Sequence, residues 1–237
     1  MDVKQLKVVG KNSSSFLWLS LIIVFISILM WRDSTQFQSP DVDKLPEPPS
    51  VQSLAFLKAS DSSFVYRLML FWLQQFDVQS GQYVSYRHLD YQRVIAWLRL
   101  LDQMEPESQY PMLLATRIYT KVADKERLRM MLDYIYQGFK SDPVKNWRWL
   151  AEATVLARHR LNDQDLALIY ATALAEETNK EIPHWARDMR LIILEDKGEI
   201  EQVKLLVGGL MASKTITDTN EIRFLELLLH RLQKNDK

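Results

Sequence analysis

Residues 89–106, LDYQRVIAWLRLLDQMEP, contain the apolar pattern from which the rest of the fold can be worked out. Asp90 stands where the N-cap of a helix is expected, and Pro106 stands where a helix has to end. The apolar side chains between them recur at the spacing of one helix face: Val94, Trp97, Leu98, Leu101 and Met104. The stretch therefore predicts one amphipathic α-helix.

The same pattern returns three times later in the chain, in residues 123–143, 162–178 and 197–211. Each of these segments follows another segment with helical apolar spacing: 111–122, 147–161 and 184–198. The equivalent inner positions are Val94, Leu128, Ala167 and Val203, which lie 34, 39 and 36 residues apart. A repeat of this length with two helices per unit is typical of a helical solenoid. We therefore expect an all-α solenoid of helical hairpins.

These units resemble the tetratricopeptide repeat family. DYQRVIAWLRLLDQMEP matches the second half of its unit, with Val94 in the small-residue position and Pro106 as the closing proline. LEDKGEIEQVKLLVGGL matches from the turn onward, with Gly198 at the turn and Val203 in the small-residue position. The resemblance covers roughly residues 61–211. The repeats are degenerate, because only Ala167 supplies an alanine in that position and the unit lengths vary.

The two ends of the array have their own features. Residues 62–76 form the first expected helix, and an insertion, residues 77–89, separates it from the next one. This insertion is either functional or packs back onto the domain, and its notable side chains are Tyr83, Tyr86 and His88. Residues 218–234 predict an amphipathic helix that caps the last apolar face. The helical-repeat domain is expected to span residues 53–237.

A long uncharged run, Asn12–Trp31, precedes this domain. Twenty helical residues span about 30 Å, which is the thickness of the hydrocarbon part of a bilayer. Trp18 and Trp31 lie toward its two ends, where indole rings favour the membrane interface. The run is longer than the apolar part of a signal peptide, and no small-residue cleavage site follows it. These features predict a retained transmembrane anchor.

The flanking charges predict the orientation of the anchor. Three lysines precede it, whereas acidic residues are frequent in the stretch that follows Arg32. By the positive-inside rule, the tail of residues 1–11 is cytoplasmic and the repeat domain lies outside, in the periplasm of a bacterium. Residues 32–52 contain four prolines and predict an extended acidic linker. The expected location is the bacterial inner (plasma) membrane, which the chain crosses once.

Composition and motifs argue against several classes of function. The 30 basic and 30 acidic residues cancel, whereas nucleic-acid binding requires a basic surface, so no nucleic-acid partner is expected. There is no cysteine, and no two of the four histidines lie within four residues of each other, so no metal-site motif exists. Neither a phosphate-binding glycine loop nor a GxSxG motif is present. We expect no cofactor and no catalysis.

Candidate partner-binding residues follow from the resemblance. Positions eighteen residues before Leu128, Ala167 and Val203 are all aromatic and begin the first helix of each unit. The family implies that these positions, and those seven, ten and eleven residues later, line a concave groove that runs here from a basic to an acidic end. They are Tyr110, Arg117, Thr120, Lys121, Trp149, Leu156, His159, Arg160, Trp185, Ile192, Glu195 and Asp196. The alternative is that the aromatic rings pack in the core.

The whole pattern predicts a membrane-anchored scaffold that binds another protein through this groove, as an accessory subunit of a bacterial envelope complex. The rival prediction is a small-ligand receptor or an enzyme in which residues 77–89 close over the groove. The sequence contains no motif that identifies a particular partner.

Overall fold

The computed structural model describes residues 18–28, 45–50, 53–54, 62–75, 89–213, 216 and 218–235. Across these residues the structure is helical and contains no strand, which confirms the prediction of an all-α fold. The chain divides into two compact units, Met1–Val42 and Asp43–Lys237. The side chains singled out in the insertion lie outside the described residues: Tyr83, Tyr86 and His88.

In the first unit, residues 18–28 form a helix within the predicted membrane span. Its large apolar side chains, from Trp18 to Ile28, are exposed. The remaining residues of the predicted span and the predicted cytoplasmic tail lie outside the described residues. None of the helices in the described part of the chain has both the length and the apolar composition needed to cross a membrane.

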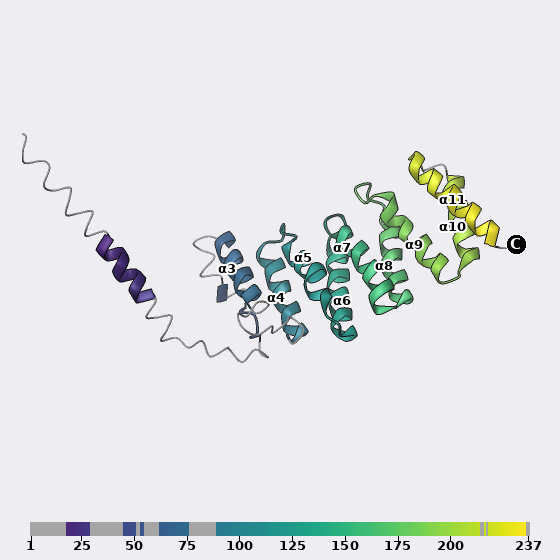
Figure 1. The fold of residues 1–237 in the computed structure, drawn as a ribbon. Helices are drawn as coiled ribbons and strands as arrows, with labels where there is room; N and C mark the ends of the chain where they lie inside the picture. The colour runs from purple at the N-terminus through teal and green to yellow at the C-terminus, as the bar shows by residue number, and fades with distance from the viewer. Residues whose placement is uncertain are drawn as a thin grey trace, which may run out of the picture. The chain divides into compact units, whose positions relative to one another are not determined.

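The second unit is a succession of helices in which each packs against the next (Figure 1). Contacts also join α4 to α6, α5 to α7 and α7 to α9, so alternate helices are neighbours as well. This arrangement is compatible with a stack of helical hairpins. The helices are α3 (Ser62–Gln75), α4 (Tyr91–Met104), α5 (Tyr110–Arg117), α6 (Lys125–Ser141), α7 (Pro143–Leu156), α8 (Gln164–Glu176), α9 (His184–Asp196), α10 (Ile200–Ser213) and α11 (Thr219–Asn235).

Helix α4 begins and ends as its sequence predicts. The Oδ1 atom of Asp90 accepts hydrogen bonds from the backbone N–H groups of Gln92, at 2.9 Å, and Arg93, at 3.4 Å. These are the donors that an N-cap residue satisfies. The helix ends at Met104, two residues before Pro106. All the predicted inner side chains are buried: Val94, Trp97, Leu98, Leu101 and Met104.

The later units repeat this burial. Their predicted inner residues Leu128, Ile135, Ala167, Leu174 and Val203 are all at most 2 % exposed. Together with the inner face of α4, most of them belong to one continuous core that runs from α3 to α9. A second apolar cluster joins α9 and α10 to α11 and includes Val203. The apolar period therefore identifies the buried faces of α4, α6 and α8 correctly, whereas in α10 Val203 is buried but the predicted inner residue Leu210 is only partly buried.

Part of the predicted linker packs against α4. Leu45 is completely buried, and its carbonyl oxygen accepts a hydrogen bond of 2.7 Å from Nη1 of Arg93. The carbonyl oxygen of Pro46 accepts a hydrogen bond of 2.8 Å from Nε1 of Trp97. The proline content suggests a free extended segment up to residue 52, but residues 45–46 are fixed to the second unit by these contacts.

A single residue, Asp142, joins α6 to α7. Its side chain accepts a hydrogen bond of 3.0 Å from the backbone N–H of Lys145, and Pro143 occupies the first turn of α7. The sequence pattern treats Asp142 and Pro143 as the end of a repeat unit. In the structure they begin the next helix, because proline suits the first turn and aspartate caps it. Helix α7 therefore starts four residues earlier than predicted.

A short π-helical turn, η2 (Ala157–Leu161), extends α7. It ends at Asn162, whose left-handed conformation (φ 56°) is one that asparagine adopts more readily than most residues. Opposite it, the 3₁₀ turn η1 (Tyr119–Lys121) follows α5. The guanidinium of Arg160 donates hydrogen bonds to the carbonyl oxygens of Thr120 and Val122, the latter at 2.8 Å. Arg160 thus connects the end of α7 to the turn before α6.

Candidate functional site

Exposed large apolar side chains lie on the first helix of each hairpin and on some of the second helices. Helices α4 and α6, which are described in full, expose none. The others are carried by α8, α10 and α11, and the N-terminal helix of residues 18–28 has its own set. We call the set on α3, α5, α7 and α9 the first-helix face: Phe64, Leu68, Phe71, Tyr110, Leu113, Val155 and Trp185.

Polar contacts tie the helices of this face together. The side-chain amide of Gln74 on α3 donates a hydrogen bond of 2.9 Å to the hydroxyl of Tyr110 on α5. Arg117 on α5 pairs with Glu152 on α7 at 3.0 Å, and Arg158 in η2 pairs with Asp196 on α9. A polar contact therefore joins each neighbouring pair of the helices that carry the first-helix face.

These pairs change the charge pattern that the resemblance implies. Arg117 at the predicted basic end is paired with Glu152, and at the acidic end Glu195 lies 3.5 Å from Arg231. Asp196 is paired with Arg158. The groove charges are thus largely balanced by neighbouring helices, and the expected gradient from basic to acidic is weaker than the sequence offsets suggest.

The aromatic row divides into exposed and half-buried members. Tyr110 begins α5 with 38 % of its surface exposed, and Trp185 is the second residue of α9 with 58 % exposed. Trp149 lies well inside α7 and is half-buried against the main core, and its buried Nε1 has no hydrogen-bond acceptor among the residues that the structure describes. The early start of α7 explains this difference, because Trp149 is not at the start of its helix.

The remaining predicted partner-binding residues also differ in how the structure uses them. Lys121 and His159 are exposed. Arg160 is committed to the carbonyl oxygens of Thr120 and Val122, so its guanidinium holds the fold together there. Its role in the structure is therefore to support the turn, which differs from the groove position implied by the resemblance.

Sequence reasoning did not identify the aromatic neighbour of Trp185. Trp147 is 6 % exposed, and its ring centroid lies 5.5 Å from that of Trp185 with the planes at 69°. Edge-to-face pairs of this kind are favourable. The guanidinium carbon of Arg148 lies 4.5 Å from the centroid of the Trp147 ring. The segment WRW at residues 147–149 therefore supplies two aromatic rings. The buried Trp147 ring supports Trp185, and the Trp149 ring packs against the main core.

A pocket of about 390 Å³ lies between α9 and the start of α11. Trp185, Asp188 and Ile192 line it from α9 at the spacing of a single helix face. Phe224 on α11 contributes another apolar wall. The remaining lining residues are Pro183, His184, Asp218, Asn220 and Glu221. The pocket therefore combines aromatic and aliphatic walls with three carboxyl groups.

The three carboxyl groups differ in their partners. Oδ1 of Asp218 accepts a hydrogen bond of 2.7 Å from the backbone N–H of Asn220 and so caps α11. Nδ1 of His184 lies 2.9 Å from Oε2 of Glu221. Asp188 is only 8 % exposed and, within the described part of the chain, has neither a hydrogen bond nor an ion pair. It is the one of the three that the fold leaves unpaired.

Burial and the nearby Glu221 raise the pKa of Asp188 to about 6, and His184 opposes this shift. Burial also raises the pKa of Glu221. In the described residues, no group of three or more His, Asp or Glu side chains is arranged to hold a metal ion. Asp188 is not among the site residues predicted from the sequence. The signal that could have identified it is a charged residue on the buried side of α9, because such positions are normally apolar.

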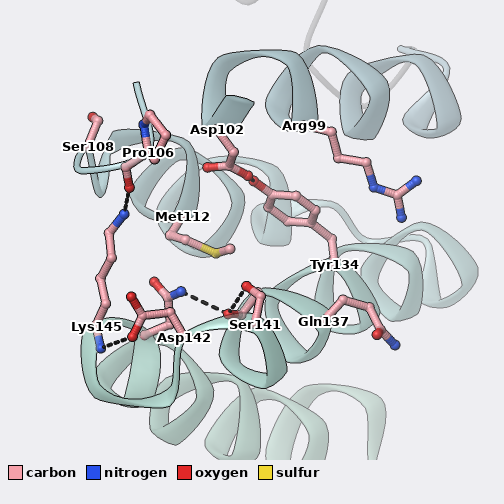
Figure 2. Close-up of a pocket in the computed structure, with 12 residues that line it drawn as sticks. Arg99, Asp102, Pro106, Ser108, Met112, Tyr134, Gln137, Ser141, Asp142 and Lys145 are labelled. Carbon is pink, nitrogen blue, oxygen red and sulfur yellow. Dashed lines mark hydrogen bonds between the residues drawn. The ribbon is translucent and has the colours of Figure 1, made fainter. Parts of the chain in front are cut away.

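A second pocket, of about 340 Å³, lies between α4, α5, α6 and the start of α7 (Figure 2). Its polar groups mostly bond to one another: the hydroxyl of Tyr134 donates to Asp102, and Nζ of Lys145 donates to the carbonyl oxygen of Pro106. The side-chain amide of Asn146 donates a hydrogen bond of 2.9 Å to the carbonyl oxygen of Gly138. Burial raises the pKa of Asp102. This network joins helices and has the character of a structural element.

The candidate residues thus lie in two places, the first-helix face and the pocket between α9 and α11. Trp185 belongs to both. Exposed apolar surface next to a partly charged pocket is suited to binding another molecule. Comparisons of this chain with protein-family models, with curated proteins and with solved structures find no match.

Proposed function

We propose that this chain is a non-catalytic scaffold that binds a partner protein through the first-helix face of a tetratricopeptide-like domain. The partner is a protein of a bacterial envelope complex, of which this chain is an accessory subunit. The observation that carries the proposal is the distribution of exposed apolar side chains. They lie on α3, α5, α7 and α9 and are missing from α4 and α6, both described in full. In the C-terminal part, α8, α10 and α11 also carry such side chains: Ile169, Leu205, Met211 and Leu227.

Surface energetics support this assignment. Water disfavours contiguous exposed apolar surface, which on soluble domains commonly marks an interaction site. Tyr110 and Trp185 belong to the residue types that contribute most at such sites. The ion pairs Arg117–Glu152 and Arg158–Asp196 join neighbouring helices of this face, so a partner meets a face that is already organised.

The proposal includes a membrane anchor formed by residues 12–31. Its basis is the uncharged run of the sequence, together with the exposed apolar side chains of the helical residues 18–28. A chain anchored in this way, with the repeat domain in the periplasm, meets its partner at the membrane surface. The reduced search volume raises the effective concentration of the two proteins.

Site-specific photocrosslinking in native membranes tests the proposed surface. A photoreactive phenylalanine analogue at Leu113 or Val155, both exposed on the first-helix face, is expected to give one discrete crosslinked protein. The same analogue at Asp133, exposed on α6, is the matched control and is expected to give none. Equal crosslinking from Asp133 and Leu113 would contradict the proposal.

Two alanine variants separate binding from stability in the same assay. Trp185→Ala is expected to abolish the crosslink at Leu113 with little change in melting temperature, because the Trp185 ring is largely exposed. Trp149→Ala is expected to lower the free energy of unfolding by about 2–3 kcal/mol, since its ring packs against the core. A Trp185→Ala protein that still crosslinks normally would remove this residue from the binding surface.

A further inference from the structure

The pocket between α9 and α11 is lined by a mostly buried residue, Asp188, whose carboxyl group has no partner among the described residues. Asp188 is more than nine-tenths buried and lines the pocket, yet it forms no hydrogen bond or ion pair within the described residues. A buried carboxylate without a partner costs free energy. Glu221 and Asp218 add negative charge, whereas His184 in the lining and the nearby Arg187 oppose it. The three carboxyl groups leave an excess of negative charge, which suits a cation.

The walls of the pocket indicate what kind of cation fits. Trp185, Ile192 and Phe224 supply aromatic and aliphatic surface, and the ring of Trp185 is 58 % exposed. A compact inorganic ion gains nothing from such walls. A cation carried on an apolar stem can lay the stem on them and place its charge over an aromatic ring. The side chains of arginine and lysine have this chemistry.

Trp185 also connects the pocket to the proposed partner surface, because it belongs to the first-helix face as well. A polypeptide lying on that face passes the mouth of the pocket. We propose that the pocket between α9 and α11 takes a basic side chain, arginine or lysine, of the bound partner protein, with Asp188 as its counter-ion and Trp185 against its stem. This inference rests on the proposed function and adds a specificity determinant to it.

Fluorine NMR of the full-length chain in detergent micelles tests the inference. The seven tryptophans are labelled with 5-fluorotryptophan, and the Trp185 resonance is assigned from its loss in Trp185→Phe. The probe is a short Gly/Ser/Leu peptide with one central arginine. It is compared with the same peptide carrying lysine and with one carrying citrulline, which has nearly the shape of arginine without the charge.

The arginine or lysine peptide is expected to shift the Trp185 resonance saturably, and the citrulline peptide to bind at least about tenfold more weakly. Asp188→Asn is expected to weaken binding of the basic peptide by a similar factor. Glu176→Gln, a charge change at an exposed site on α8, is expected to leave it unchanged. Because the citrulline comparison uses the unaltered protein, it does not depend on the folding of any variant.

Several results would overturn the inference. They are equal binding of the arginine and citrulline peptides, normal binding to Asp188→Asn, and a Trp185 resonance that no basic peptide moves. Binding of methylguanidinium as tight as that of the peptide would make the pocket a site for small cations instead. Crosslinking at Leu113 that persists when the peptide arm fails overturns this inference alone. Missing crosslinks together with normal peptide binding overturn the proposed function alone.

Discussion

Asp188 is the residue at which folding and binding make opposite demands. Its carboxyl group is buried in the wall of the pocket between α9 and α11, where only an apolar or neutral side chain would favour the folded state. Residues that reduce stability in this way are typical of functional sites. The free-energy cost of burying the charged Asp188 side chain can be measured because it depends on pH.

Asp188→Asn is expected to raise the free energy of unfolding at pH 7 by about 1–3 kcal/mol. Burial raises the pKa of Asp188 to about 6 in the folded protein, against about 3.9 in the unfolded chain. The folded state therefore holds this proton more tightly, and stability falls as pH rises from about 4 to about 6. Asparagine does not ionise, so the Asp188→Asn variant does not lose stability in this way as pH rises.

Urea denaturation at pH 4 and pH 7 measures the difference between the two proteins. The advantage of Asp188→Asn is expected at pH 7 and should shrink toward zero near pH 4, where the native carboxyl is protonated. Glu221, His184 and Arg187, the other charged groups around Asp188, are present in both proteins and largely cancel in the comparison. An advantage of the same size at both pH values would show that ionisation of Asp188 is not its cause.

For single residues, the sequence predicts the inner positions of helices well and the site residues only partly. Val94, Leu128 and Val203 are buried as predicted, because the 3.6-residue period depends only on local spacing. The assignment of Trp149 depended on where α7 begins, which Asp142 determines by capping the helix that follows it. The spacing marks Asp188 only as a charged residue at an inner position of α9, because the other wall of its pocket is formed by α11, farther along the sequence.

Among the elements, the π-helical turn η2, like the 3₁₀ turn η1, is not foreseen by periodicity. The π turn has the larger effect on a side chain named in the sequence analysis. It widens the end of α7 and places Arg160 where its guanidinium reaches the carbonyl oxygens of Thr120 and Val122. A π turn bonds residue i to residue i+5, and because η2 lies at the end of α7 no apolar period continues beyond it to reveal the change. The helices themselves were predictable from their patterns, but this local widening is decided by the tertiary contacts it makes.

Arg160→Met is expected to lower the free energy of unfolding by about 1–3 kcal/mol, because two backbone carbonyls lose charge-assisted hydrogen bonds. The neighbouring exposed residue provides the control, and His159→Ala is expected to change stability by less than about 0.5 kcal/mol. Chemical denaturation measures both. If Arg160→Met abolishes the crosslink at Leu113 with stability unchanged, Arg160 contacts the partner, as the family resemblance implies.

For the whole chain, the last helix completes the packing that the repeated units leave open. Leu225, Leu228 and Leu232 of α11 are at most 1 % exposed and pack with Val203 and Val207 of α10. The same helix carries Glu221 and Phe224 into the pocket beside α9. One element thus both covers the final apolar face and lines the proposed recognition pocket, so under the proposal folding of this end is coupled to binding.

The proposed topology makes a prediction about the chain as a whole. Three lysines precede residues 12–31, whereas Asp33, Asp41 and Asp43 follow, so the positive-inside rule places the repeat domain in the periplasm. Alkaline phosphatase fused after Lys237 is expected to be active, because it folds only after export. A green fluorescent protein fused at the same place is expected to remain dark when exported in unfolded form. The opposite pair of results would contradict the proposed topology.

The same fusions distinguish an oriented anchor from a segment that merely promotes export. Replacing the three lysines before residue 12 with glutamate removes the charge bias that retains the N-terminal tail in the cytoplasm. Phosphatase activity is then expected to fall and fluorescence to appear in part of the population. Deleting residues 12–31 should remove both export and membrane association, since no comparable apolar run remains in the sequence. A lysine-to-glutamate variant that keeps full phosphatase activity would show that charge does not orient this segment.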